Sequence, residues 1–207
     1  MPPTTVSIMR CSRKLDAHLF GLVLLLFIGT TQAADIVAER ARLIAGDEGY
    51  SLNADYKVSL NPRLEEAVNK GIALFFTADF ELTRSRWYWF ERTVVQHSKT
   101  FQLSYHALTR QYRLSSGALH QSFSTLAEAL QVLSRLRHWL VIEKSEISEG
   151  VEYTASTRLR LDPSQMAKTF QVSALSNRDW NPSSEWLTWN FSASDSAVFD
   201  AASKDGK

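Results

Sequence analysis

Three polar residues whose side chains could bind an anion recur through one stretch of the chain: His106, Arg113 and His120. Apolar and polar residues alternate there, with interruptions near Thr109-Arg110 and at Ser116-Gly117, which predicts three antiparallel strands joined by tight turns. The three polar side chains would then form a row, one per strand, on the face opposite the apolar residues. An arginine fork flanked by histidine donors is chemistry suited to an oxyanion. The stretch is FQLSYHALTRQYRLSSGALHQSF, residues 101–123.

The register of these strands follows from the turns. A two-residue Ser-Gly turn would pair Leu114 with Leu119, and the preceding turn would pair Tyr105 with Leu114. These pairings keep the apolar faces together across all three strands. A three-residue second loop would instead turn Leu119 and Phe123 to solvent.

Metal binding is not expected at this row. The two histidines would stand about 10 Å apart, which is two strand spacings, with a cation between them. A shared metal ion needs closer ligands. Because polar residues on the wet face of an antiparallel sheet are common, we favour a solvated face and keep the anion site as the alternative. No metal and no cofactor is expected.

The sequence contains no recognisable catalytic motif. It lacks H-E-x-x-H, G-x-S-x-G and a glycine-rich phosphate loop. Asp79 and Glu81 are carboxylates at alternate positions, but we expect them on an outward strand face as solvated charges. The segment DWNPSSE, residues 179–185, lacks the central glycine of a calcium loop and is interpreted as a turn. These observations favour a protein that is not an enzyme.

Tryptophan is concentrated in two places. The segment RSRWYWFERTVV, residues 84–95, has four consecutive aromatic residues beside arginines, and a second group follows between residues 180 and 189. Three interpretations are open for the first segment: a strand buried on both faces, which we favour, an aromatic platform for a ligand such as a sugar or lipid, or a patch at lipid headgroups. The candidate ligand-binding tryptophans are Trp87, Trp89, Trp186 and Trp189.

The elements that position these residues are mostly strands. Apolar residues occupy every second position in residues 50–60, 74–82 and 151–161. Such alternation indicates strands with one apolar and one wet face, which is typical of antiparallel sheets. We therefore predict a mainly β, antiparallel, β-sandwich-like fold.

Two segments instead show helical features and are predicted to cover the sheets as short α-helices. In residues 61–71, Asn61 is the expected N-cap, Pro62 the first helical residue and Gly71 the terminator. In residues 125–138, Thr125 and Glu128 form a capping-box pattern, and apolar residues share one face as far as Leu136. Basic residues at the end of this second segment suit the negative end of a helix dipole.

The N-terminus has the features of a secretory signal. Three basic residues precede a short apolar run, Leu19 to Ile28, that ends in GTTQA. A membrane-spanning helix needs about 20 apolar residues, so we expect cleavage between Ala33 and Ala34 and no transmembrane helix afterwards. The expected organisation is a signal peptide over residues 1–33, one β-rich domain over 34–191 and a disordered tail over 192–207.

Cleavage would change the composition of the chain. Cys11, the only cysteine, would leave with the signal, which excludes disulfides and cysteine nucleophiles from the mature protein. The signal also holds three basic residues and Asp16, so the mature charge is (23 − 3) − (22 − 1) = −1. A near-neutral chain is not expected to bind nucleic acid, because displacing counterions from phosphate requires a basic excess.

Several longer motifs resemble a family of exported proteobacterial proteins, domain of unknown function 4390. They are RWYWFE, LSYHALTRQYRLS, QSFSTLAEAL and RLRLDPSQMAKTFQVSALSNRDWNPSSEW. The similarity runs from about Ala34 to Trp189. The resemblance implies a gene often placed beside a nitrogen-regulation-type membrane sensor kinase, and hence a periplasmic address. It carries over no catalytic residue.

Together these observations predict an exported periplasmic protein that binds rather than catalyses. The first hypothesis is an accessory or interaction module in envelope signalling, whose partner is a membrane sensor kinase or another envelope protein. The alternative is a small-ligand binder, for a sugar or lipid, that acts through exposed tryptophans. A hydrolase that uses outward carboxylates and His106 or His120 is the least favoured hypothesis.

Overall fold

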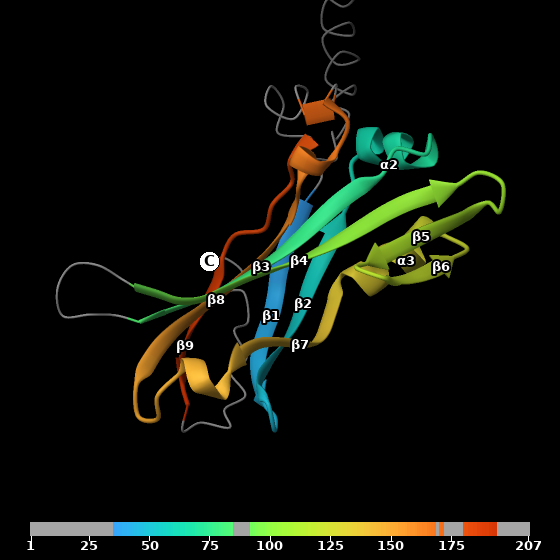
Figure 1. Cartoon of the computed structure of the whole chain (residues 1–207). Helices are drawn as coiled ribbons and strands as arrows, with labels where there is room; N and C mark the ends of the chain where they lie inside the picture. The colour runs from blue at the N-terminus through green and yellow to red at the C-terminus, as the bar shows by residue number, and fades with distance from the viewer. Residues whose placement is uncertain (1–34, 85–91, 169, 172–179, 194–207) are drawn as a thin grey trace, which may run out of the picture. The chain divides into compact units, whose positions relative to one another are not determined.

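The structure is a computed structural model that describes residues 35–84, 92–168, 170–171 and 180–193. Two antiparallel sheets account for most of them. The smaller sheet has the order β1-β2-β7, and the larger has the order β6-β5-β4-β3-β8-β9. The predicted fold class, mainly antiparallel β and sandwich-like with two short helices, is confirmed (Figure 1). The strands are β1 (Asp35–Ala45), β2 (Gly49–Ser59), β3 (Leu74–Arg84), β4 (Arg92–His106), β5 (Gln111–Ser116), β6 (Leu119–Phe123), β7 (Arg135–Glu143), β8 (Glu152–Leu161) and β9 (Leu187–Ser192).

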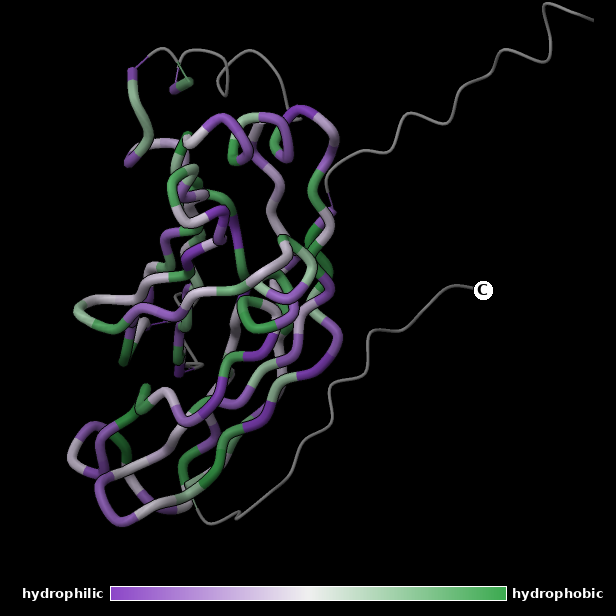
Figure 2. The backbone as a smooth tube through the Cα atoms, turned by 90° about the vertical axis from the view of Figure 1, so that its right-hand side faces the viewer, coloured by the Kyte–Doolittle hydropathy of each residue, from purple (hydrophilic) through white to green (hydrophobic). Residues whose placement is uncertain are grey.

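The core lies between the two sheets and is built from the alternating apolar residues. Phe76 and Phe80 of β3 and Leu52 of β2 have no exposed surface, and Figure 2 shows apolar and polar residues alternating along the chain. Burial of alternate residues is clearest in β8, where every second residue from Tyr153 to Leu161 is buried. The strands β2, β3 and β8 predicted from alternation are thereby confirmed, but in β3 the outward-facing Thr77 and Asp79 are buried as well.

A buried hydrogen-bond chain joins the two sheets through the core. The Thr157 hydroxyl of β8 donates to the Asp79 carbonyl oxygen at 2.9 Å. It therefore accepts from the Tyr56 hydroxyl of β2, whose oxygen lies 2.8 Å away. Burial raises the pKa of Tyr56 well above its ordinary value despite the bond to Thr157. The tyrosine hydroxyl stays protonated and supplies a buried polar contact between the two sheets.

The first helix forms as predicted. Helix α2 (Pro62–Asn69) has Pro62 at its start, and the Asn61 side chain accepts a hydrogen bond from the Leu64 amide at 2.8 Å. Gly71 follows with φ of 86°, a left-handed conformation that favours glycine. The helix packs against β4 through its buried apolar side, Leu64, Ala67 and Val68.

The second helix is shorter than predicted. Helix α3 (Leu126–Leu133) begins at the expected cap, where Thr125 accepts from the Glu128 amide at 3.2 Å. It ends at Leu133, and the predicted last turn belongs to strand β7. Leu136 does become buried, but on a sheet rather than on a helix. The spacing of the apolar residues is compatible with a helix or a strand. Hydrogen bonding to β2 makes residues from Arg135 onward a strand.

The register of β4, β5 and β6 differs from the prediction by two residues at each turn. The second turn is Gly117-Ala118, with Gly117 at φ of 59°, so Leu114 pairs with Gln121 and not with Leu119. On the other side, Leu114 pairs with Leu103 and not with Tyr105. A shift of two preserves which face each side chain points to, but it changes which side chains are neighbours.

The boundaries of the predicted domain are partly described. Every element above belongs to the unit Ala33–Lys207. Strand β9 continues to Ser192, one residue into the segment predicted to be a tail. The predicted signal peptide, with Ala33 and Ala34 at its cleavage site, and residues 194–207 lie outside the described residues.

Candidate functional site

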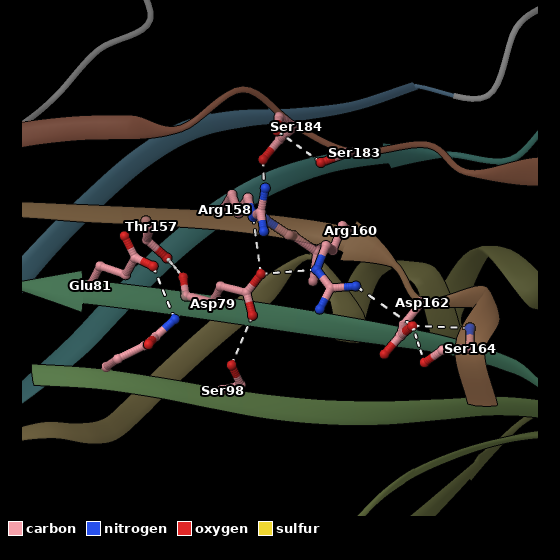
Figure 3. A network of polar contacts seen from close by, with 12 residues as sticks. Asp79, Glu81, Ser98, Thr157, Arg158, Arg160, Asp162, Ser164, Ser183 and Ser184 are labelled. Carbon is pink, nitrogen blue, oxygen red and sulfur yellow. Dashed lines mark hydrogen bonds and ion pairs between the residues drawn. The ribbon is translucent and has the colours of Figure 1, made fainter. Parts of the chain in front are cut away.

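A buried carboxylate at the centre of the larger sheet accepts hydrogen bonds from side chains of two neighbouring strands. Asp79 is only 6% exposed, although it lies on the sheet face away from the core. Its Oδ1 accepts from the Ser98 hydroxyl at 2.8 Å, and its Oδ2 accepts from Nε of Arg158 at 3.0 Å and Nε of Arg160 at 2.9 Å (Figure 3). The prediction that Asp79 is a solvated charge is therefore wrong, because the two arginines on the neighbouring strand cover it.

The register explains why these residues meet. Asp79 lies on β3 between Ala78 and Phe80, whose side chains enter the core, so its own side chain points outward. It pairs directly with Ser98 of β4 and Arg158 of β8. Paired residues of antiparallel strands share a face, and Arg160 rejoins that face two residues after Arg158. Three adjacent strands thus converge on one carboxylate.

The electrostatics of the cluster favour the charged form of Asp79. Burial alone would raise the pKa of Asp79, but the hydrogen bonds from Ser98, Arg160 and Arg158 outweigh it and hold the pKa below its ordinary value. The carboxylate is ionised at neutral pH, and its partners among the described residues, Ser98, Arg158 and Arg160, are all hydrogen-bond donors. It is therefore unsuited to exchanging a proton with a substrate.

The cluster continues along β8 to a second carboxylate. Arg160 Nη1 lies 3.6 Å from Asp162 Oδ1. Asp162 caps the short 3-10 turn η2 (Pro163–Gln165), accepting from the Ser164 amide at 3.1 Å and the Ser164 hydroxyl at 2.6 Å. Burial would raise the pKa of Asp162, but hydrogen bonds from Ser164 and Gln165 lower it overall. Asp162 is a capping residue that also fixes Arg160.

An aromatic ring covers the outer end of the cluster. The Arg158 guanidinium lies 4.4 Å from the centroid of the Trp186 ring, a cation–π contact. Arg158 and Trp186 are both half-buried, so each presents an edge to solvent. Beside Trp186 is a cavity of about 310 Å³ between β1 and residues 183–187. Its lining includes Ile36, Val37, Ser183, Glu185 and Leu187.

The four predicted ligand-binding tryptophans do not form one platform in the described structure. Trp189 pairs with Ala155, faces the core and is 7% exposed. Trp186 contacts Arg158 on the opposite face of the same sheet. Trp87 and Trp89 lie outside the described residues. Of the two described members of this set, Trp189 belongs to the core and Trp186 lies at the surface.

The predicted row of His106, Arg113 and His120 is only partly correct. All three side chains share a face, as the prediction required. However, Arg113 pairs with Ser104 and Ser122, while the two histidines pair with other residues, His106 with Gln111 and His120 with Ser115. The three therefore occupy different levels along the strands and not one line. Arg113 Nε is buried without a hydrogen-bond partner among the described residues.

Two further observations concern the described residues only. They contain no group of three or more His, Cys, Asp or Glu side chains arranged to hold a metal ion. Within the same residues, no helix combines the length and apolar character needed to cross a membrane.

The sequence holds a signal for the Asp79 cluster that alternation alone does not reveal. Arg158 and Arg160 alternate in RLRLD, which puts both guanidinium groups on the polar side of β8. Strands β3 and β8 are distant in the sequence. Only their pairing brings these two guanidinium groups to the Asp79 carboxylate. A search for opposite charges on the polar faces of predicted strands would have named Asp79, Arg158 and Arg160 as candidates, but only the register of β3 and β8 joins them.

The two sheets define a β-sandwich-like domain. The outer face of its larger sheet carries the polar cluster around Asp79, with Trp186 at one edge. The chain belongs to the family described as Domain of unknown function (DUF4390), whose model matches residues 33–190. The family resemblance predicted from the sequence is thereby confirmed. No curated protein and no solved structure matches the chain.

Proposed function

We propose that this protein is an exported periplasmic interaction module that acts by binding another envelope protein and not by catalysis. The observation that carries the proposal is the Arg158–Trp186 pair, held on the outer sheet face by the buried Asp79 carboxylate. Arginine and tryptophan are among the residue types most enriched at the energetic centres of protein interfaces. Side chains fixed before binding lose less conformational entropy on association.

The state of Asp79 supports binding over acid–base chemistry. A catalytic carboxylic acid needs a pKa near the working pH, whereas the donors around Asp79 lower its pKa. Both arginines donate their Nε–H groups to this carboxylate. Their remaining surface faces solvent, with about a third of each side chain exposed. Such a face can recognise a partner without changing it chemically.

The periplasmic part of the proposal rests on the N-terminal sequence. Basic residues, a short apolar run and the small residues before Ala34 are the features of a cleaved secretory signal. The choice of an envelope protein as partner, with a membrane sensor kinase as the first candidate, rests on the family resemblance.

Export is tested by expressing the full chain in a Gram-negative host and measuring the intact mass of the protein in each cell fraction. We expect a periplasmic species that begins at Ala34. An Ala33→Asp variant removes the small residue required at the cleavage site and should accumulate as the longer species. Full-length wild-type protein confined to the cytosol would contradict the proposal.

The interface is tested by chemical cross-linking in intact cells. The tagged protein should give a cross-linked species of fixed mass, and Trp186→Ala or Arg158→Ala should weaken it about tenfold or more, as expected for a hot-spot residue. Leu119→Ala is the control, because Leu119 is 80% exposed on β6, away from this face. Circular dichroism checks that each variant is folded. The absence of any species above background, or one insensitive to both variants, would overturn the proposal.

A second candidate function is the binding of a small ligand such as a sugar or lipid. The cavity of about 310 Å³ beside Trp186 favours it, since small-molecule sites begin at about this size. The Trp186→Ala variant separates the two candidates. If a small ligand binds there, a sugar or lipid fraction of an envelope extract shifts the tryptophan fluorescence of the protein but not that of the variant.

A further inference from the structure

We propose that the outer face of the smaller sheet carries an anion-binding pocket, built on Arg135 and Arg137 with Arg40 beside them, that takes a phosphoryl-type oxyanion. The pocket is a cavity of about 370 Å³. It lies on a different sheet from the Asp79 cluster and does not depend on the proposed interface. Its lining residues are Glu39, Arg40, Asp55, Tyr56, Ser134, Arg135 and Arg137.

Two β-bulges converge at this pocket. In β1 the pairing with β2 skips Glu39, which is an extra residue between Ala38 and Arg40. In β7 the pairing skips two residues, Arg137 and His138, which together lie opposite Asn53. His138 adopts a left-handed φ of 49°. Bulges redirect side chains and are enriched at functional sites, and here two strands carry them at adjacent levels of the sheet.

The register places three charged side chains side by side. Arg40 of β1 pairs with Asp55 of β2, and Asp55 pairs in turn with Arg135 of β7. Asp55 lies between the core residues Ala54 and Tyr56, so this row faces away from the core. One carboxylate therefore stands between two arginines from the neighbouring strands.

Arg137 is held in a fixed orientation over the same carboxylate. Its Nη1 donates to the carbonyl oxygens of Ala54 and Leu136, each at 2.9 Å, and its Nη2 forms an ion pair with Asp55. Three of the five N–H donors of the guanidinium are thus used. The remaining two have no partner among the described residues. Arg137 is consequently preorganised with donors still available.

Arg135 supplies further unused donors. It is exposed, and the structure records no hydrogen bond or ion pair for it with any described residue. The lining carries three arginines against two carboxylates, Glu39 and Asp55, so the pocket has a net positive charge.

The chemistry of this donor set favours an oxyanion. Guanidinium groups offer planar pairs of N–H donors that match the oxygens of a phosphoryl group. Arg42 and Lys57 extend the positive charge on the same sheet face, since Arg42 follows Arg40 by two residues and Lys57 follows Asp55 by two. A cation would meet a net positive charge in this lining. The same phosphoryl chemistry is presented by inorganic phosphate and by anionic lipid headgroups.

The test uses the purified protein and two probes: inorganic phosphate by titration calorimetry, and phosphatidylglycerol vesicles by cosedimentation, with phosphatidylcholine vesicles for comparison. Arg135→Gln should weaken binding about tenfold, the cost of losing a charged hydrogen bond. Glu39→Gln removes a negative lining charge and should tighten binding about threefold. Arg110→Gln, which removes the same charge from the β4–β5 turn, is the matched control and should change little.

The outcomes distinguish the sources of the ligand. Phosphate binding that is lost in Arg135→Gln and strengthened in Glu39→Gln supports the pocket as a site for a free anion. Binding to phosphatidylglycerol vesicles alone, with the same response to the variants, supports a lipid headgroup as the ligand. Binding of neither probe, or binding that Arg110→Gln weakens as much as Arg135→Gln, would overturn the proposal.

Discussion

Replacing Asp79 with asparagine is expected to lower the free energy of unfolding by about 3 kcal/mol, because removing one partner of a buried ion pair leaves the other charges uncompensated. Arg158 would keep no ion pair among the described residues, and Arg160 would keep only its 3.6 Å contact with Asp162. The amide can still accept a hydrogen bond but carries no charge. Urea unfolding followed by circular dichroism measures the loss.

The matched control is Glu81→Gln. Glu81 lies two residues along the same strand and on the same face, and among the described residues its side chain accepts one hydrogen bond, from Gln96 at 3.0 Å. Surface contacts of this kind contribute about 0–1 kcal/mol. Equal effects of the two substitutions would contradict the central place given to Asp79.

The cluster also predicts how stability depends on pH. The folded-state pKa of Asp79 is below its ordinary value, so the folded state binds this proton less readily than the unfolded chain does. The stabilisation is present above the unfolded-state pKa of about 4. It is lost as the pH falls through that value and then through the lower folded-state pKa. In Asp79→Asn this part of the acid sensitivity should be absent.

Replacing Phe80 with alanine is expected to cost about 3–5 kcal/mol, the range for deleting a buried aromatic ring. Phe80 has no exposed surface and lies on β3, with β4 and β8 on either side of it. Its loss leaves a cavity between the two sheets. The midpoint of thermal unfolding should fall by roughly 6–20 °C, at about 2–4 °C per kcal/mol for a domain of this size.

Leu108→Ala is the control for this prediction, because Leu108 is fully exposed in the turn between β4 and β5. Its melting temperature should match that of the parent protein. A Phe80→Ala variant as stable as Leu108→Ala would show that the two sheets do not pack through this residue.

The strands that the sequence predicted well are those with an unbroken alternation. In β8 every second residue is buried without exception. The strands β1, β7 and β9 were not predicted, and two of them, β1 and β7, contain a bulge. In β1 the buried residues are Ile36 and Ala38 before the bulge and Ala41 and Leu43 after it. The extra residue, Glu39, therefore shifts the alternation by one position, so the sequence shows no continuous period of two. The local sequence pattern alone therefore misses strands that contain a β-bulge, and these bulges are what redirect the side chains.

The candidate site could not be predicted because it depends on pairing between distant segments. Asp79 is an outward-facing residue, as its place in β3 indicated, but its burial comes from arginines on β8. The same limit applies to His106, Arg113 and His120. Alternation predicted their shared face, whereas the Gly117-Ala118 turn decides their neighbours. The local sequence pattern determines which face of a sheet a side chain occupies, whereas the register between strands determines which side chains it contacts.

The ionisation of Asp79 tests most directly whether this face is a fixed binding surface. Carbon-13 NMR of the aspartate carboxyl groups, recorded as a function of pH, gives the pKa of Asp79 in the folded protein, and Asp79→Asn assigns its signal. The donors from Ser98, Arg158 and Arg160 predict a pKa below the ordinary value of about 3.9. A pKa well above that value would mean a carboxyl group able to carry a proton near neutral pH, which would contradict the arrangement and reopen a catalytic role.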